Sequence, residues 1–513
     1  MDISQRIYDT ALNEFMDICK VPHSSNEVDK PNYANHFGPF TKFIMTKIKS
    51  YGVKKIMKDD IGNIWFDIPA SKGCNNFKKI ILQSHMDMVW DAVKEATKWN
   101  RWTHPISQPV IEKIKGELVM HTNKYLTSLG ADDGEGMAII LSVLKHREEF
   151  KHGNIRCLLT VDEEPGLIGA QKLGIIKGKQ NNVVGGYDYL LNIDTPLLNT
   201  IIASSAGGRM RKWIIDKIVS EKVNKQPIYQ IAISDCHGGH SADQIDDGYA
   251  NPVKLANEIL LKIGDVKLIS FTTPNTEVNN KIPKESLVKF VSNKSNNEIK
   301  KIVTACMQLF KKQYKAEKNI KINFKKISGS FKCIKELKDT KHILNLIKQF
   351  PYGPLTRFND DHFVETSCNI APIELNLNNE HEQFVLQTYF RSANLKKIDS
   401  IDKQIVSIFN KIIKSNFKKA SSNLINQIPP WEYKKVNPLM DLAIKGYKKI
   451  GIKARTYKVH CALECSYFVK QNPKLCQISI GPQTDFEHNV RETLHLASYK
   501  NLAKVILYML SNL

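Results

Sequence analysis

Two adjacent acids, Glu163 and Glu164, are the first residues in the sequence whose type and placement suit chemistry. The apolar segment 157–161 before them predicts a buried strand, and Pro165-Gly166 after them predicts a turn. Consecutive side chains that leave a strand point in different directions, so the two carboxylates can serve different roles. One can bind a metal ion while the other transfers a proton, although a solvated surface turn would have the same pattern.

Other acids and a histidine follow predicted strands or open a predicted helix. They are His85 and Asp87 after the strand 79–85, Asp194 at the end of the strand 189–194, and Asp132 and Asp133 before a helix over 134–146. The carboxyl ends of parallel strands meet at one edge of a sheet, where ligands bind in α/β proteins. Any one of these residues is explained by a cap or a turn. Their joint placement instead predicts a site.

The elements that would position these residues alternate between strands and helices. Such alternation indicates an α/β domain with a mostly parallel sheet and helices on both faces. Its predicted helices cover 1–20, 40–51, 134–146, 167–176, 440–450 and 496–510, and its strands cover 79–85, 154–161, 189–194 and 476–480. The pattern changes from about Ser204, with strands over 210–218, 228–234 and 384–389 and helices over 252–263, 297–312 and 398–413. We therefore predict a catalytic domain over 1–203 and 429–513, interrupted by an inserted α+β domain over 204–428.

Composition narrows the class of protein. The 513 residues are 42% hydrophobic and 25% charged, as in soluble globular proteins of several domains, and no window reaches the ~18 apolar residues that a membrane span needs. Acids within the first twenty residues argue against a signal peptide. Ten scattered cysteines suggest free thiols, and hence a cytoplasmic protein. The net charge of +22 comes mainly from dispersed lysines, so we expect no nucleic-acid partner.

Five of the residues form a mixed imidazole and carboxylate set that suits zinc, with cobalt or manganese as substitutes. They are His85, Asp132, Glu164, Asp194 and His488. Five ligands exceed the need of one open catalytic ion, but they suit two ions that share a bridging carboxylate. A water between two ions would be ionised near neutral pH and would attack an amide carbon. An uncoordinated carboxylate would then handle its proton.

Six motifs occur in an order that resembles a known family. They are His85-Met-Asp87, Gly130-Ala-Asp-Asp-Gly-Glu-Gly136, Asp162-Glu-Glu164, Asn192-Ile-Asp194, Gly238-Gly-His-Ser241 and Phe486-Glu-His488. The chain resembles the aminoacyl-histidine dipeptidases, also called cytosol non-specific dipeptidases, among the co-catalytic zinc peptidases that include carboxypeptidase G and aminoacylase. The resemblance covers nearly the whole chain.

The resemblance implies a role for each ligand. Asp132 would bridge two zinc ions, His85 and Asp194 would complete the shell of one, and Glu164 and His488 would complete the shell of the other.

It also implies roles for the residues around the ions. Glu163 would be the general base, and Asp87 would orient the His85 imidazole, as metal-bound histidines require. The peptide bond Asp132–Asp133 would be cis.

The inserted domain resembles the family's lid. There His240 matches a histidine that polarises the scissile carbonyl, and Asn280 and Arg391 match positions that hold the substrate's C-terminal carboxylate. Glu464, in the catalytic domain, would meet the substrate's free ammonium group.

The chain departs from the family's pattern at several positions. Asp133 and Glu135 replace a neutral residue and an aliphatic one, and Glu487 replaces a proline before the metal-binding histidine. Thr195 stands where relatives usually carry an acid. The extra acids could raise the affinity for metal or shift the pKa of the base, but they remove no ligand.

We therefore predict a di-zinc dipeptidase that acts on Xaa-His and other dipeptides and handles long peptides poorly. One alternative is a related amidohydrolase, either a deacylase of N-acyl amino acids or a carboxypeptidase. Another is a non-catalytic binding protein on the same fold. A homodimer is an open alternative to a monomer.

Overall fold

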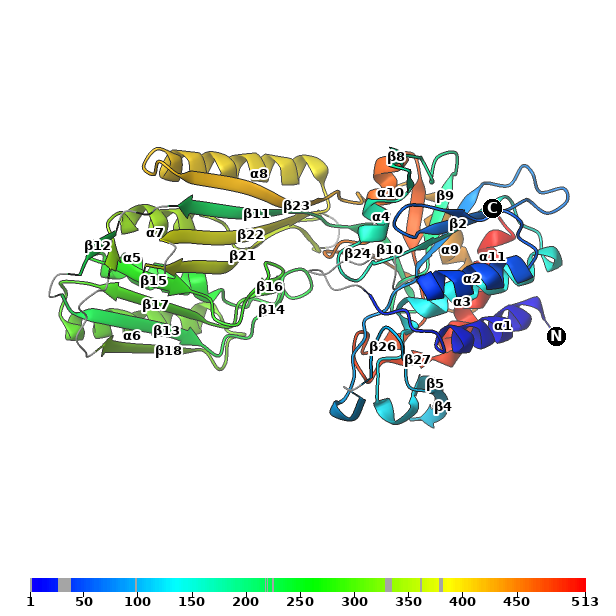
Figure 1. Ribbon diagram of the computed structural model, residues 1–513, viewed down its shortest axis with the longest axis horizontal. Helices are drawn as coiled ribbons and strands as arrows, with labels where there is room; N and C mark the ends of the chain where they lie inside the picture. The colour runs from blue at the N-terminus through cyan, green and yellow to red at the C-terminus, as the bar shows by residue number, and fades with distance from the viewer. Residues whose placement is uncertain are drawn as a thin grey trace. The chain divides into compact units, whose positions relative to one another are not determined.

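The structure is a computed structural model that describes residues 2–25, 38–96, 99–216, 218, 220–223, 226–327, 335–359, 362–377 and 382–513. The chain divides into two compact units (Figure 1). Unit 1 comprises Met1–Ser205, Tyr433–Val459 and Leu463–Leu513, and unit 2 comprises Ala206–Glu432 and His460–Ala462. Within the described residues, no helix has the length and apolar character needed to cross a membrane.

Unit 1 is built on a mixed eight-stranded sheet. Its strands, in spatial order, are β1 (Met57–Lys58), β2 (Ile64–Ile68), β6 (Ile155–Thr160), β3 (Ile80–His85), β9 (Tyr189–Asn192), β25 (Cys476–Ser479), β10 (Thr200–Ser205) and β24 (Arg455–Val459). The four central strands β6, β3, β9 and β25 run parallel. β2 is antiparallel to β6, and β10 is antiparallel to β25. The predicted α/β class is confirmed, and the parallel part is the centre of the sheet.

Apolar sequence explains why the parallel strands occupy the centre. β6 is mostly apolar, the first half of β3 is apolar, and both strands are almost completely buried, as expected for strands covered on both faces. In their register His85 lies opposite Thr160, and Gln83 of β3 lies opposite Asn192 of β9. The carboxyl ends of these three strands therefore lie side by side.

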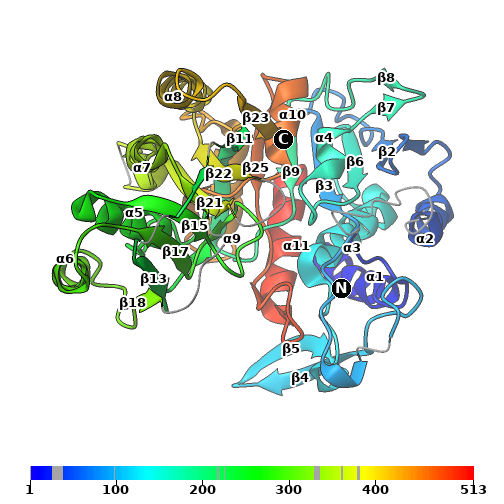
Figure 2. The same ribbon diagram turned by 60° about the vertical axis from the view of Figure 1, so that its left-hand side comes forward.

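The helices of unit 1 pack on the sheet and on one another. Helix α3 (Ala131–Lys145) packs on β3, and α1 (Ile3–Ile18) packs on both α3 and α11 (Leu496–Leu510) (Figure 2). Further helices of unit 1 include α2 (Gly38–Ser50), α9 (Pro438–Lys449), which packs on α11, and α10 (Cys465–Gln471). Five of the six predicted helices form within a few residues of the expected ends.

The predicted helix over 167–176 is wrong in its second half. Helix α4 covers only Ile168–Gln171, and the chain continues into a hairpin of β7 (Ile175–Ile176) and β8 (Lys179–Gln180). Gly174 and Gly178 both have positive φ, +83° and +72°, which a helix does not accept.

A second, four-stranded sheet in unit 1 has no counterpart among the predicted elements. It consists of β26 (Thr484–Asp485), β27 (Thr493–His495), β5 (Glu117–Thr122) and β4 (Pro109–Ile114), all antiparallel. The loop between β26 and β27 contains His488. This sheet, rather than the central one, therefore positions one of the predicted ligands.

Unit 2 contains a nine-stranded antiparallel sheet. Its strands, in spatial order, are β18 (Lys321–Ile327), β13 (Ile228–Ser234), β17 (Ser286–Val291), β15 (Lys267–Thr272), β21 (Val364–Asn376), β22 (Gln383–Ser392), β11 (Gly207–Asp216) and β23 (Ala420–Ile428), with β20 (Gly353–Arg357) paired to β21. The remaining strands form two short pairs, β12 (Ser220–Lys222) with β19 (Lys335–Leu337) and β14 (Gly239–His240) with β16 (Lys281–Ile282).

Four helices pack with this sheet around a separate apolar core. They are α5 (Pro252–Ile263), α6 (Asn296–Gln313), α7 (Thr340–Gln349) and α8 (Leu395–Phe409). The predicted helix over 398–413 continues beyond α8 as a short π-helical segment over 410–414. Strands and helices of unit 2 thus follow the predicted α+β pattern, although most of its strands were not anticipated.

Candidate metal centre

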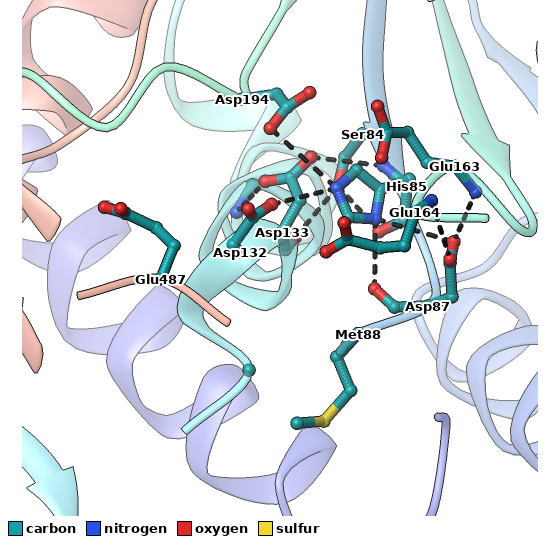
Figure 3. Close-up of polar contacts among 12 residues, drawn as sticks. Ser84, His85, Asp87, Met88, Asp132, Asp133, Glu163, Glu164, Asp194 and Glu487 are labelled. Carbon is teal, nitrogen blue, oxygen red and sulfur yellow. Dashed lines mark hydrogen bonds and ion pairs between the residues drawn. The ribbon is translucent and has the colours of Figure 1, made fainter. Parts of the chain in front are cut away.

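Seven of the predicted site residues gather at the carboxyl ends of the central strands of unit 1. His85 is the last residue of β3, and Asp87 follows it. The pair of glutamates follows β6, Asp194 follows β9, and Asp132 lies in the first turn of α3 (Figure 3). His488 comes from the β26–β27 loop. The arrangement predicted from strand ends is therefore present for the residues that follow β3, β6 and β9.

Asp132 lies between two imidazoles. Its Oδ1 is 2.9 Å from Nε2 of His85, and its Oδ2 is 3.2 Å from Nε2 of His488. The peptide bond Asp132–Asp133 is cis, as the resemblance implied. One carboxylate therefore faces two different nitrogen donors, one through each oxygen.

Two further acids flank the imidazoles. Glu164 Oε1 lies 2.8 Å from Nε2 of His488, and Asp194 Oδ1 lies 3.8 Å from Nε2 of His85. Ligand atoms around a tetrahedral ion with bonds of ~2.1 Å are about 3.4 Å apart, and the four separations lie close to that value. The donor set therefore fits two cations.

The compact groups of donor atoms also include an acid that the resemblance did not assign. His85, Asp132 and Glu164 form one group, and His85, Asp133 and Asp194 form the other, each with its atoms within 4.8 Å of one another. Both groups share His85. Asp133 is thus an additional candidate ligand. It stands where the family's pattern has a neutral residue.

Acidic side chains are crowded together at this site, and burial and their mutual repulsion shift their pKa values. Burial alone would raise the pKa of Asp132, but the hydrogen bonds from His488 and His85 lower it below its ordinary value. Burial and the charge of Asp132 raise the pKa of Glu164 to about 7, against the opposing effect of His488. Burial and Asp132 likewise raise the pKa of Asp194 well above its ordinary value. Acids packed in this way are stabilised by bound cations.

Asp87 is fully buried and holds the backbone of the glutamate pair. Its Oδ1 accepts the backbone N–H of Glu163 at 2.9 Å, and its Oδ2 accepts that of Glu164 at 3.2 Å. The hydroxyl of Ser25, a partner that the sequence did not reveal, donates to Oδ2 at 2.9 Å. Nδ1 of His85 lies 3.0 Å from the main-chain oxygen of Asp87 and 3.5 Å from its carboxylate. Asp87 therefore contacts the imidazole mainly through its backbone.

Glu163 has the environment expected of a base. Burial raises its pKa well above the ordinary value, the positive charge of His85 opposes this, and the charges of Glu164 and Asp194 add to it. Among the described residues, none donates a hydrogen bond to its carboxylate. Glu163 is thus an uncoordinated acid beside the candidate ligands.

The three acids that depart from the family's pattern have different surroundings. Asp133 Oδ2 accepts the backbone N–H of His85 at 3.1 Å, and Oδ1 accepts that of Gly136 at 3.2 Å. A Cβ atom at Gly136 would lie 2.2 Å from Asp133 Oδ1, so this packing requires glycine. Glu135 is buried beside Asp133, whereas Glu487 accepts a hydrogen bond from the Thr484 hydroxyl. Only Asp133 belongs to a group of candidate ligands.

Glu464 is the residue before α10, and its buried side chain contacts β3 and β6. Its Oε2 accepts hydrogen bonds from the side chains of Gln83 and Thr160. Burial raises its pKa to about 7, although His85 and the two hydrogen bonds oppose the shift. Its other oxygen has no hydrogen-bond partner among the described residues.

Unit 2 brings its three predicted substrate residues together around Ser241. His240 lies on β14, and the main-chain oxygen of Asn280, next to β16, accepts the N–H of Ser241. Nη2 of Arg391, on β22, lies 3.5 Å from the Ser241 hydroxyl. Among the described residues, the buried Arg391 Nε and Asn280 Oδ1 have no hydrogen-bond partner. Nδ1 of His240 pairs with Asp243 at 2.8 Å.

One histidine and one glutamate near these sites, His460 and Glu492, were not predicted. His460 of unit 2 is half-buried, and its Nε2 lies 2.7 Å from the Ser367 hydroxyl. Glu492 of unit 1 accepts backbone N–H groups from the loop before α3. Neither residue follows a predicted strand or belongs to a quoted motif, so no signal in the spacing could have identified it.

The chain is similar to known peptidases in sequence and in fold. Residues 81–512 match the model of the Peptidase family M20/M25/M40. The cytosol non-specific dipeptidase of Escherichia coli (strain K12) is 28% identical over 500 residues, which cover 94% of this chain and 93% of that protein. The crystal structure of aminoacylhistidine dipeptidase from Vibrio alginolyticus is 25% identical with a TM-score of 0.83, covering 99% of this chain and 98% of that one. Aminopeptidase PepT from Bacillus cereus, 14% identical with a TM-score of 0.59 over 98% of both chains, is similar in fold.

Proposed function

Because the chain belongs to the peptidase family M20/M25/M40 and is therefore a peptide-bond hydrolase, we propose that it is a metal-dependent dipeptidase acting on Xaa-His and other dipeptides. Two relatives that align with more than nine tenths of the chain support this substrate class, since both are named as dipeptidases. The observation that carries the proposal is Asp132, whose two oxygens face two imidazoles beside the uncoordinated Glu163.

The candidate centre would hold two zinc ions, or cobalt or manganese in their place. Asp132 would bridge them, with His85 and Asp194 on one ion and Glu164 and His488 on the other. The bound ions would lower the pKa of a water molecule and polarise the scissile carbonyl. The choice of nitrogen and oxygen donors supports this assignment.

The protein's own groups would handle the proton. Glu163 would accept a proton from the attacking water at its free carboxylate and deliver it to the leaving amine. Asp87 would keep the backbone of both glutamates in place.

The inserted domain, which we place at 204–428, would act as a lid that binds the substrate. Arg391 and Asn280 would hold the C-terminal carboxylate, His240 would stabilise the developing oxyanion, and Glu464 would bind the free ammonium group. The buried, unpartnered atoms of Arg391 and Asn280 support the carboxylate role, because a buried polar group without a partner is costly. The name of the Escherichia coli relative supports a cytoplasmic enzyme, and a homodimer remains an alternative to the monomer.

The test is a hydrolysis assay after reconstitution with zinc, manganese or cobalt. It compares an Xaa-His dipeptide with the same dipeptide acetylated at its amine. We expect a chelator to abolish hydrolysis, added metal to restore it, and acetylation to reduce kcat/KM at least about tenfold, because a buried carboxylate would lose its ammonium partner.

Two results would change the assignment. Equal rates for the free and acetylated substrates would indicate the related deacylase or carboxypeptidase. Failure to take up metal would indicate a binding protein without catalytic activity.

A further inference from the structure

One buried carboxylate outside the ligand set is bonded to the loop that carries the bridging aspartate. Glu492 is 2% exposed. Its Oε2 accepts the backbone N–H groups of Leu129 and Gly130, both at 2.8 Å, and its Oε1 accepts that of Asp132 at 3.2 Å. Three hydrogen bonds thus fix the chain from residue 129 to the ligand itself.

Glu492 comes from the same loop as a ligand. The loop between β26 and β27 contains His488, whose Nε2 lies 3.2 Å from Asp132 Oδ2. One short segment therefore supplies an imidazole that contacts the Asp132 carboxylate and a carboxylate that holds the Asp132 backbone. Displacing either His488 or Glu492 would change the separation between the side chains of His488 and Asp132.

A second carboxylate links the same two segments. Oδ2 of Asp91 accepts the N–H of Val490 at 3.1 Å. Asp91 is in turn tied to Ser128, through the Ser128 N–H to its main-chain oxygen at 2.9 Å and through its own N–H to the Ser128 hydroxyl at 3.1 Å. The connection between segments 488–492 and 128–132 is therefore made twice.

We propose that Glu492 is a positioning residue for metal binding, which holds residues 129–132 so that Asp132 presents its two oxygens to His85 and His488. This inference rests on the proposed metal centre. It assigns Glu492 no contact with metal or substrate. Its effect is carried by the backbone of the bridging ligand, and a preorganised ligand set binds an ion more tightly than one that must be ordered first.

The chemistry of the three bonds indicates which substitution is informative. A carboxylate is an acceptor at both oxygens, whereas the amide of glutamine has one acceptor oxygen and one donor group. In Glu492→Gln the oxygen can still accept from Leu129 and Gly130. The amide nitrogen then faces the N–H of Asp132, and the bond nearest to the metal ligand is lost while the side-chain volume is kept.

The test measures zinc affinity in the full-length chain by competition with a chromophoric chelator. We expect Glu492→Gln to bind zinc about 10- to 100-fold more weakly than the wild type, a typical cost of losing a group that supports a metal ligand. Melting of the chelated proteins serves as the structural readout.

The chain offers a matched control in unit 2. Glu317 is 4% exposed and accepts the backbone N–H groups of His237 and Ala250, each at 2.9 Å. Glu317→Gln therefore removes the same kind of bond from the same kind of site. We expect it to lower the melting temperature of the chelated protein at least as much as Glu492→Gln, while leaving zinc affinity within about twofold of the wild type.

The outcomes separate the proposals. Wild-type zinc affinity in Glu492→Gln, or an equal loss in both variants, would overturn the positioning role. If Glu492→Gln does not fold, Asp91→Asn decides in its place, because weaker zinc binding supports the role and unchanged binding overturns it. A wild-type protein that binds no zinc would instead overturn the proposed function.

Discussion

The two units form their candidate sites in different ways. In unit 1 the side chains come from the ends of three adjacent strands, the first turn of α3 and the β26–β27 loop, and they already contact one another, with the two imidazoles on Asp132 as the centre. In unit 2 they come from a short strand pair and one long antiparallel strand, and Arg391 and Asn280 keep buried polar atoms that no described residue satisfies. A preassembled cluster suits ion binding and catalysis, whereas unpartnered polar atoms suit a ligand that supplies the missing partner. Substitutions in the ligand cluster of unit 1 should therefore affect turnover or metal affinity, and those at Arg391 or Asn280 of unit 2 should affect the affinity for substrate.

The largest effect should follow from Glu163→Gln. This change keeps the side-chain volume but removes the proton acceptor, so we expect kcat to fall about 10²- to 10⁴-fold while zinc content stays at the wild-type level. Steady-state kinetics and metal analysis measure the two quantities. Glu148→Gln, at an exposed acid of unit 1, is the control and should leave both unchanged. Near wild-type turnover in Glu163→Gln would show that another group is the base.

Asp87→Asn should have a smaller effect, a loss of zinc affinity. One of the two oxygens that accept the N–H groups of Glu163 and Glu164 becomes a donor, so the backbone of this pair, which includes the proposed ligand Glu164, loses a hydrogen bond. We expect zinc to bind about 10-fold more weakly, measured by competition with a chelator. If zinc affinity is unchanged and only kcat falls, Asp87 acts through the base and not through the ligands.

The central sheet of unit 1 is where the sequence predicts the site best. His85, Glu164 and Asp194 follow β3, β6 and β9, and the rule that parallel strands end at one edge was enough to bring them together. His488 follows no central strand, since it lies in a hairpin loop of the second sheet, and only the family's motif identified it. Glu492 could not be predicted, because a carboxylate that accepts backbone N–H groups leaves no trace in residue spacing.

The errors in the predicted fold also have local causes. The prediction of a helix over 167–176 counted apolar residues and overlooked Gly174, whose backbone conformation ends the helix. Some missed strands of unit 2 have few buried positions, so polar residues interrupt their short apolar pattern. β18, with the sequence Lys-Ile-Asn-Phe-Lys-Lys-Ile, is an example.

In unit 2, Arg391→Lys should change substrate affinity with little effect on turnover. Lysine keeps the charge but cannot bind a carboxylate through two parallel bonds, and it loses the packing of the guanidinium over the Tyr389 ring, 3.9 Å from the ring centre. We expect KM for a dipeptide to rise about 10-fold, with kcat within a factor of about two and zinc affinity unchanged. A fall in kcat with KM unchanged would place Arg391 at the reacting atoms instead.

The smallest effect concerns the pH dependence of stability, which should have opposite signs in the two units of the chelated protein. In unit 1 burial raises the pKa of Glu164, Glu464 and Glu492 to about 7, from the ordinary 4.5. Between these values the folded state binds more protons than the unfolded chain, so stability falls as pH rises. His488 continues the trend above pH 6.5, since hydrogen bonds to Asp132 and Glu164 raise its pKa to about 11 despite burial. Burial lowers the pKa of His23 to about 4, so this histidine makes unit 1 more stable as pH rises. It is one group against three acids, so the acids should set the direction of the trend.

In unit 2 burial lowers the pKa of His460 to about 3, helped by Arg391, and lowers that of Lys254 to about 8. A basic group whose pKa is lowered in the folded state makes the protein more stable as pH rises toward the ordinary pKa, which is 6.5 for the histidine and 10.5 for the lysine.

Hydrogen exchange at about pH 5 and pH 7, corrected for the intrinsic rates, should therefore show weaker protection of buried amides in unit 1 at the higher pH and stronger protection in unit 2. The corresponding shifts in melting temperature are on the order of a few degrees. Zinc should reverse the trend in unit 1 alone, because metal binding requires the ligands to be deprotonated. The same pH trend in both units would mean that the buried acids do not set the stability of the metal-binding unit.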